Sequence, residues 1–300
     1  MKKWIFAWLL ASLGPVVFAQ DEDLQENEGA AVSATKITFL SNRLKLTPDQ
    51  AKLFWPVYSG LDAEKKGIIK SLNDLRSKVS TKATDEDFKS ALKTLGEIRQ
   101  KNLDVEKNYL NKFLNVITPR QTLLLYKAEN DFSVGLLQQY TEKKEANGND
   151  KIMNAKIAYI TKELNLSVEQ AKQFWIVYDK VDEERKGFRN NLKLLWEKNT
   201  SPAASDEDVK VALKEMLNVK QKQVDFEKKQ PERFMKVISA RQTVRLQNSE
   251  IGFQRELLKE LRERARQNQE KRQMQNGQRR ENTREQIKEK RQDQRQKGKE

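Results

Sequence analysis

The stretch LSNRLKLTPDQAKLFWPVY, residues 40–58, decides how this chain folds, because a strongly marked helix start precedes closely spaced aromatic residues. In Thr47-Pro48-Asp49-Gln50 the threonine hydroxyl can accept a hydrogen bond from the backbone N–H three residues on. The glutamine side chain can bond back to the threonine N–H, which completes a capping box. Pro48 falls at the first helical position, where its missing N–H costs nothing. The motif predicts a helix that begins at Pro48.

The same box recurs three times, as ITPRQ (117–121), LSVEQ (166–170) and ISARQ (238–242). The last two keep the hydroxyl and the glutamine but lack the proline. Since losing an N-cap costs about 1 kcal/mol, we interpret these side chains as structural caps in preference to ligand contacts. The predicted capping residues are Thr47, Pro48, Gln50, Thr118, Pro119, Gln121, Ser167, Gln170, Ser239 and Gln242.

The boxes reveal an internal duplication. Phe54 and Phe174 are 120 positions apart, and after one inserted residue the offset becomes 121, as between Phe113 and Phe234. A fixed offset of this kind indicates two successive copies of one structural unit. We define copy one as residues 34–141 and copy two as residues 151–261. The connector is predicted at 142–150, where Asn-Gly is a turn signal.

The apolar spacing within each copy predicts four helices. In copy one these are a short helix at 34–45, a long one at 48–79, a third that Thr84 and Asp87 cap, and a fourth that opens at the second box. A 30-residue helix is about 45 Å long, so we expect an all-α fold of two tandem, elongated units built from antiparallel hairpins. Pro56 and Pro231 fall inside long helices and are expected to bend them.

The two ends of the chain differ from this body. Residues 1–19 have the basic start, short apolar core and small-residue cleavage site of a signal peptide, with removal expected after Ala19. Residues 20–33 are expected to be flexible. Residues 262–300 carry fourteen Lys or Arg against seven Asp or Glu and almost no apolar side chains, so this tail is expected to be helical or disordered, outside any core.

Composition argues against an enzyme. The chain has no Cys and no His, so it lacks disulfides, a thiolate nucleophile and a ready proton shuttle near neutral pH. Its glycines are scattered and form no phosphate-binding loop. We therefore predict no catalytic residue, no metal site and no cofactor.

One aromatic residue is not shared by the copies. Trp196 stands where copy one has Arg76, and it lies between Lys193 and Lys198. An apolar ring flanked by cations would suit an unfolded acidic segment, so these three residues are the candidate client-binding site. The alternative is that Trp196 packs in the core, since Leu192 lies one helical turn before it.

Four LTxxQ-like boxes in an exported, helical, Cys-free and basic chain resemble the LTxxQ-motif periplasmic family that includes the Spy and CpxP proteins. The longer pattern ITFLSNRLKLTPDQAKLFWPVY (37–58) is also similar to exported sensors of extracytoplasmic-function sigma factors. The resemblance covers residues 35–261 and omits the tail. It implies a periplasmic, ATP-independent chaperone or envelope-stress adaptor.

The partners that the resemblance implies are unfolded or partly folded envelope proteins, or a membrane stress sensor. Spy-type members form a thin cradle from two identical antiparallel subunits, whereas this chain carries both units and is expected to form a pseudo-dimer by itself. The alternative function is binding to an anionic surface or polyanion through the basic tail. Specific nucleic-acid binding is not expected, because the tail has no aromatic residue for base stacking.

Overall fold

The computed structural model describes residues 36–78, 83–140, 148–201 and 203–257, with residues 259, 260, 263, 266, 267, 270, 271 and 273–275. Their regular structure is helical throughout, without a strand, so the all-α prediction is confirmed for this part of the chain. The predicted signal peptide (1–19), the segment 20–33 and most of the tail lie outside the described residues. No described helix combines the length and the apolar character that crossing a membrane requires.

Each copy contributes two long helices and two flanking ones. Copy one contains a helix at 36–44, then α2 (Pro48–Lys78), α3 (Asp85–Leu114) and α4 (Pro119–Tyr140). Copy two contains α5 (Gly148–Glu163), α6 (Val168–Asn199), α7 (Asp206–Phe234) and a helix that begins at residue 240 and is described without a break to residue 257. We call the first and the last of these the N-terminal helix and the C-terminal helix.

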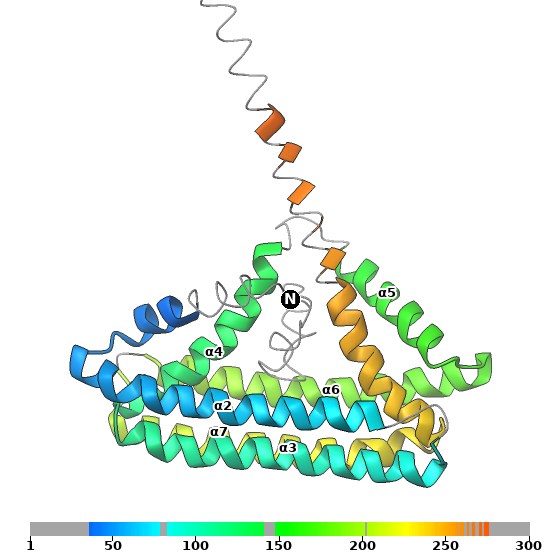
Figure 1. Ribbon diagram of the computed structural model, residues 1–300, viewed down its shortest axis with the longest axis horizontal. Helices are drawn as coiled ribbons and strands as arrows, with labels where there is room; N and C mark the ends of the chain where they lie inside the picture. The colour runs from blue at the N-terminus through cyan, green and yellow to red at the C-terminus, as the bar shows by residue number, and fades with distance from the viewer. Residues whose placement is uncertain are drawn as a thin grey trace, which may run out of the picture.

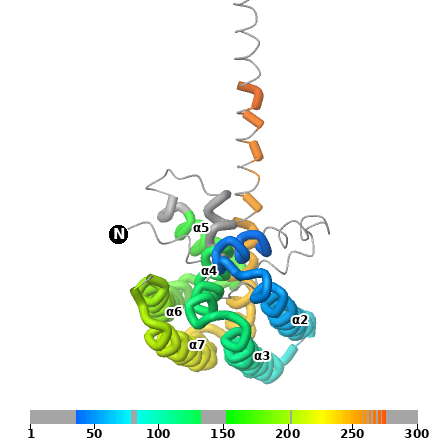
Figure 2. The backbone as a smooth tube through the Cα atoms, turned by 90° about the vertical axis from the view of Figure 1, so that its left-hand side faces the viewer, coloured from blue at the N-terminus to red at the C-terminus, as the bar shows by residue number. Residues whose placement is uncertain are grey.

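The four long helices form one curved layer. Figure 1 shows α2 and α3 side by side, and α6 and α7 behind them. Seen end-on in Figure 2, the order around the arc is α6, α7, α3, α2, with α4 inside the arc. The two hairpins therefore meet where α3 packs against α7. The α4 and C-terminal helices rise from this layer toward the side opposite the α3–α7 contact.

The helix boundaries follow local capping chemistry. At each of the four boxes the hydroxyl accepts from the backbone N–H of the glutamine, and the glutamine side chain accepts from the N–H of the capping residue. Thr84 and Ser205 form the same reciprocal box with an aspartate at the starts of α3 and α7. A residue with positive φ follows the first helix of each copy: Lys45 comes directly after residue 44, and Asn165 comes two residues after Glu163. Residues in this conformation commonly end helices.

One sequence expectation needs adjustment. The connector was predicted to extend to residue 150, but α5 already begins at Gly148, so its last three residues are helical. Pro56 lies inside α2 and Pro231 lies in the last turn of α7, so both prolines fall within helices as predicted, and the bends expected at them stay a prediction.

The apolar core has three parts. One cluster lies within copy one around Phe54 and Phe113, and a second lies within copy two around Phe174 and Phe234. All four of these phenylalanines are fully buried. The third cluster spans the copies, and its buried members are Leu110 and Leu123 of copy one with Leu192, Val209, Leu213, Met216 and Val219 of copy two. The two units are therefore not independent, because they share this third cluster.

Candidate functional site

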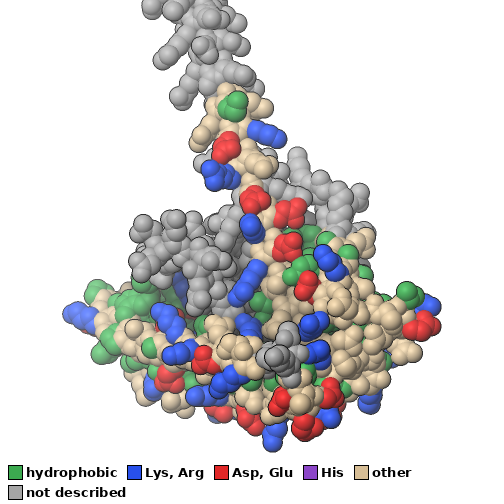
Figure 3. All heavy atoms as spheres, turned by 45° about the vertical axis from the view of Figure 1, so that its right-hand side comes forward, with side chains coloured by type: hydrophobic (Ala, Val, Ile, Leu, Met, Phe, Trp, Pro, Cys, Tyr) green, Lys and Arg blue, Asp and Glu red, His purple; other side chains and the backbone are tan. Residues whose placement is uncertain are grey.

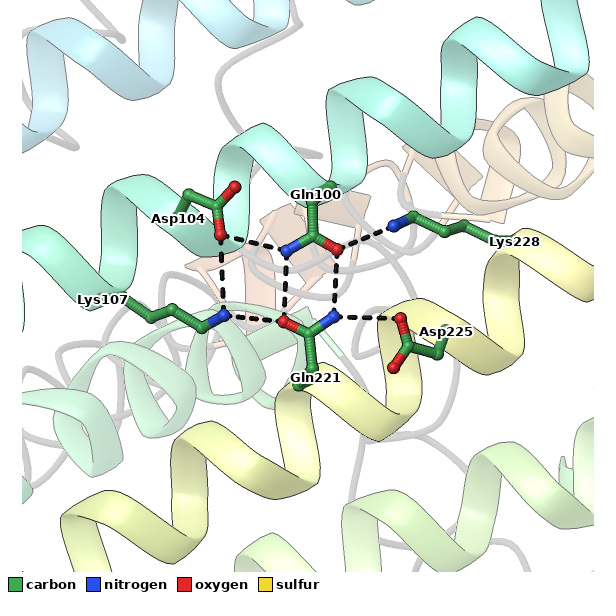
Figure 4. Close-up of polar contacts among 6 residues, drawn as sticks. All are labelled: Gln100, Asp104, Lys107, Gln221, Asp225 and Lys228. Carbon is green, nitrogen blue, oxygen red and sulfur yellow. Dashed lines mark hydrogen bonds and ion pairs between the residues drawn. The ribbon is translucent and has the colours of Figure 1, made fainter.

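The contact between α3 and α7, which we call the joint, carries a polar cluster drawn in Figure 4. Its members are Gln100, Asp104 and Lys107 of α3 and Gln221, Asp225 and Lys228 of α7. Nε2 of Gln100 donates to Oε1 of Gln221 at 3.1 Å, and Nε2 of Gln221 donates back at 3.0 Å. Lys107 donates to Gln221 at 2.7 Å, and Lys228 donates to Gln100 at 2.8 Å.

This cluster is arranged about a pseudo-two-fold axis. Each of its three residues on α3 stands 121 positions before the equivalent residue on α7, so the offset found in the sequence reappears as symmetry. The two aspartates follow the rule too, since each accepts at 3.0 Å from the glutamine four residues before it. Contacts that occur twice with the roles exchanged define an isologous interface, as in a symmetric dimer. Here the interface lies within one chain.

A second polar layer at the joint sets two buried carboxylates against partly buried cations. Glu106 of α3 pairs with Lys220 of α7, and Glu227 of α7 pairs with Arg99 of α3 at 3.3 Å. Lys65 of α2 approaches Glu106 at 3.5 Å. Burial alone would raise the pKa of the Glu106 carboxyl, but Lys220 and Lys65 outweigh it and lower that pKa to about 2. These charges are therefore compensated where water is largely excluded.

The second box of copy one also contacts copy two, through Arg120. The guanidinium of Arg120 donates to the backbone oxygen of Ser201 at 2.6 Å and to that of Ala204, in the segment between α6 and α7. At the other end, the guanidinium of Arg241, the counterpart of Arg120, lies 5.4 Å from the ring centroid of Phe88 at the start of α3. The boxes thus contribute to assembly as well as to helix starts.

The structure brings the predicted capping glutamines together in pairs. Gln50 and Gln121 exchange side-chain hydrogen bonds at 2.9 and 3.0 Å, and Gln121 also donates to the backbone oxygen of Leu44 at 3.2 Å. Gln170 and Gln242 form the equivalent pair in copy two at 3.4 Å. A glutamine amide both donates and accepts, whereas a glutamate at this position has no donor. This pairing was not predicted, although the choice of Gln in all four boxes was a signal for it.

Each copy contains a polar centre where its first, second and fourth helices meet. In copy one Tyr58 donates to Glu129, which pairs with Lys36 at 2.9 Å. In copy two the equivalent Tyr178 donates to Glu250 at 2.8 Å. The Lys36 ammonium lies 5.7 Å from the ring centroid of Tyr58, and the equivalent lysine of copy two lies 5.0 Å from that of Tyr178.

The polar centre of copy two is larger and more deeply buried. Arg185 donates to Glu250 at 3.0 Å and to Gln230 at 2.6 Å, and all three side chains are buried. Burial by itself would raise the pKa of Glu250, but Arg185 and Lys156 hold that pKa below its ordinary value. Burial raises the pKa of the nearby Asp182 carboxyl to about 6, against the opposing effect of the surrounding cations.

The candidate client-binding residues do not form one exposed site. Trp196 is half-buried and packs against the third apolar cluster, and its Nε1 atom is buried with no hydrogen-bond partner among the described residues. Lys193 pairs with Glu197 at 3.5 Å, and Lys198 is exposed. The placement of the ring matches the packing alternative. Client contact by these three residues stays a prediction.

Exposed apolar side chains are few and separate. Figure 3 shows Lys, Arg, Asp and Glu interspersed over the face in view, with hydrophobic atoms in small patches between them. Ile37 is 48% exposed on the N-terminal helix, and Ile157, its equivalent 120 positions later, is 36% exposed on α5. The exposed Leu194 and Val211 have polar counterparts in copy one, Asp74 and Ser90.

Comparisons with known proteins do not indicate a function for this chain. No protein-family model, no curated protein and no solved structure matches it. Within the described ranges, no three acidic side chains lie close enough together to hold a metal ion.

Proposed function

We propose that this chain is an exported client-binding protein that acts without ATP, as a chaperone or as an adaptor in the envelope stress response. The observation that carries the proposal is the exposure of equivalent isoleucines, Ile37 and Ile157, in the two copies. Full burial of a large aliphatic side chain is worth about 1.5–3 kcal/mol, and these two isoleucines, 48% and 36% exposed, leave roughly half of that or less for a client's apolar segment to supply.

The joint supports this proposal by holding the two isoleucines in one body. Buried ion pairs and the third apolar cluster connect the copies, so a client meets two equivalent contacts at once. Two weak contacts held together bind far more tightly than either one alone, provided that the client reaches both. The charged side chains around them keep the chain soluble while they leave the contacts open.

The test is an aggregation assay without ATP, with a chemically unfolded substrate and the mature chain. We expect the protein to delay aggregation at stoichiometric amounts. The double variant Ile37→Lys/Ile157→Lys should lose most of this effect. The matched control Leu194→Lys/Val211→Lys alters residues that are 62% and 58% exposed but not equivalent in the two copies, and it should keep the effect.

Two outcomes would change the proposal. If the unaltered chain does not delay aggregation, the chaperone function is wrong and the adaptor remains. If the delay disappears at high salt while the isoleucine variant keeps it, the basic tail carries the binding, because screening weakens charge contacts and leaves apolar ones intact.

A further inference from the structure

The joint has a property that does not depend on the proposed function. We infer that α3 of one molecule can pack against α7 of a second molecule as it does within one chain, so that two chains associate by exchanging copies. The partner is therefore this same protein. The inference rests on the reciprocity of the contacts at the joint.

The charged residues at the joint carry the same signs at equivalent positions of α3 and α7. On α3, Arg99 is positive and Glu106 is negative; at the equivalent positions of α7, Lys220 is positive and Glu227 is negative. The polar cluster of Figure 4 is reciprocal in the same way, since Gln100 and Gln221 exchange hydrogen bonds with each other. Every polar contact made within one chain can thus be made between α3 of one chain and α7 of another.

What favours pairing within one chain is the covalent connection. Two units joined by a short linker in one chain meet at an effective concentration on the order of millimolar. Exchange is therefore suppressed in dilute solution and becomes competitive when chains fold at high concentration. Domain swapping requires a contact that can form equally well within one chain or between two chains, and the joint meets this condition.

Exchange between chains would disrupt few apolar contacts, because of where the apolar clusters lie. The clusters around Phe54 and Phe174 each belong to one copy, so neither has to open. Only the third cluster needs residues from both copies, and an exchanged pair rebuilds it between chains. The end of α4 and the start of α5 lie on the side of the molecule away from the joint, as Figure 1 shows.

Two charge-swapped full-length chains test the inference. The first carries Glu106→Lys and Glu227→Lys, and the second carries Arg99→Glu and Lys220→Glu. Within either chain the joint then opposes like charges. Between the two chains, α3 of each meets α7 of the other with opposite charges at all four ion-pair positions. We expect the equimolar mixture, unfolded and refolded together, to form a species of twice the monomer mass that contains one of each chain.

Each variant refolded alone should give at least fivefold less of this species. The matched control uses ion pairs away from the joint, with Asp49→Lys/Glu169→Lys in one chain and Lys52→Glu/Lys172→Glu in the other. That mixture should stay monomeric. A joint-variant mixture that yields only folded monomers would overturn the inference.

A second measurement decides the matter if the swapped chains do not fold. The unaltered protein is refolded at concentrations from about 10 μM to about 1 mM, a range that reaches the effective concentration of the connected copies. Light scattering then measures the fraction of doubled mass. We expect this fraction to rise at least tenfold over the range. A fraction independent of concentration contradicts exchange.

Discussion

The polar centres of the two copies show how one fold can be completed in two ways. In copy one, Tyr109 is buried, and its hydroxyl donates to Glu64 at 2.9 Å. In copy two the equivalent residue is Gln230, which accepts from Arg185. The lysine–tyrosine–glutamate group is common to both, but copy one surrounds it with an aromatic ring and copy two with buried charge.

A neighbouring glycine accounts for this difference. A Cβ atom at Gly60 would lie 2.8 Å from the hydroxyl oxygen of Tyr109, so the tyrosine fits because that position has no side chain. At the equivalent position copy two has Lys180, and the tyrosine is replaced by the shorter Gln230. Two linked differences thus replace a tyrosine that bonds to Glu64 with a glutamine that bonds to Arg185. The comparison teaches that duplicated units diverge in groups of touching residues.

The largest expected difference between the copies concerns the central glutamates. Glu250→Ala removes the buried partner of Arg185 and should lower the free energy of unfolding by about 3–5 kcal/mol, because it leaves an uncompensated charge inside copy two. Glu129→Ala in copy one removes a side chain that is 18% exposed, beside a lysine that is 24% exposed, and should cost about 1–3 kcal/mol. Urea titrations measure both values. Equal losses would contradict the different burial of the two centres.

The pH dependence of copy two should follow Asp182. Its pKa is raised to about 6 from an ordinary value near 4, so the folded protein binds a proton between pH 6 and pH 4 that the unfolded chain does not bind. This group therefore favours the folded state increasingly as the pH falls through that range, by up to about 3 kcal/mol.

The charged groups around Asp182 are Lys156, Lys186, Arg185 and Arg189. Their attraction opposes the effect of burial without cancelling it. Asp182→Asn should be more stable than the unaltered chain at pH 7, and this advantage should disappear near pH 4. Chemical unfolding of both proteins across this range checks the prediction. A difference that does not vary with pH would show that Asp182 titrates normally.

Two glycine substitutions should act in opposite directions. Gly60→Ala places a methyl group against Tyr109 and should lower stability by about 1–2 kcal/mol, since overpacking exceeds the gain in helix propensity. Gly187→Ala on α6 meets no atom within 4 Å and should raise stability by about 0.5–1 kcal/mol. Thermal unfolding with urea titration compares them. A stabilising Gly60→Ala would mean that Tyr109 moves aside freely.

The smallest expected difference between the copies concerns the caps, where the copies are alike. Thr47→Ala and Ser167→Ala each remove the hydroxyl of one capping box and should each lower stability by about 1 kcal/mol, because the hydroxyl that accepts from the backbone N–H of the glutamine is lost in both. Delay of client aggregation by the folded variants should stay unchanged. Loss of that effect at an unchanged melting temperature would assign the hydroxyls to binding.

The helices could be predicted from the sequence, but the contacts between them could not. The boxes at Thr47 and Ser167 predicted where the helices start, since capping depends on residues three positions apart. The pairing of Gln50 with Gln121 joins residues 71 positions apart, and no local rule predicts it. For Trp196, helical spacing indicated that Leu192 would be an apolar neighbour. It did not indicate that α4 of the other copy would contribute to the apolar cluster against which Trp196 packs.

By itself, the sequence determined the helices, their caps and the duplication, because these depend on short-range hydrogen bonds and on the 3.6-residue period. Only the tertiary structure decided that α3 packs on α7, with Glu106 facing Lys220 across 114 positions of the chain. Periodicity identifies which face of a helix is apolar, but it does not say which other helix covers that face. The covering helix is selected by packing and charge complementarity between distant residues, which exist only once the chain has folded.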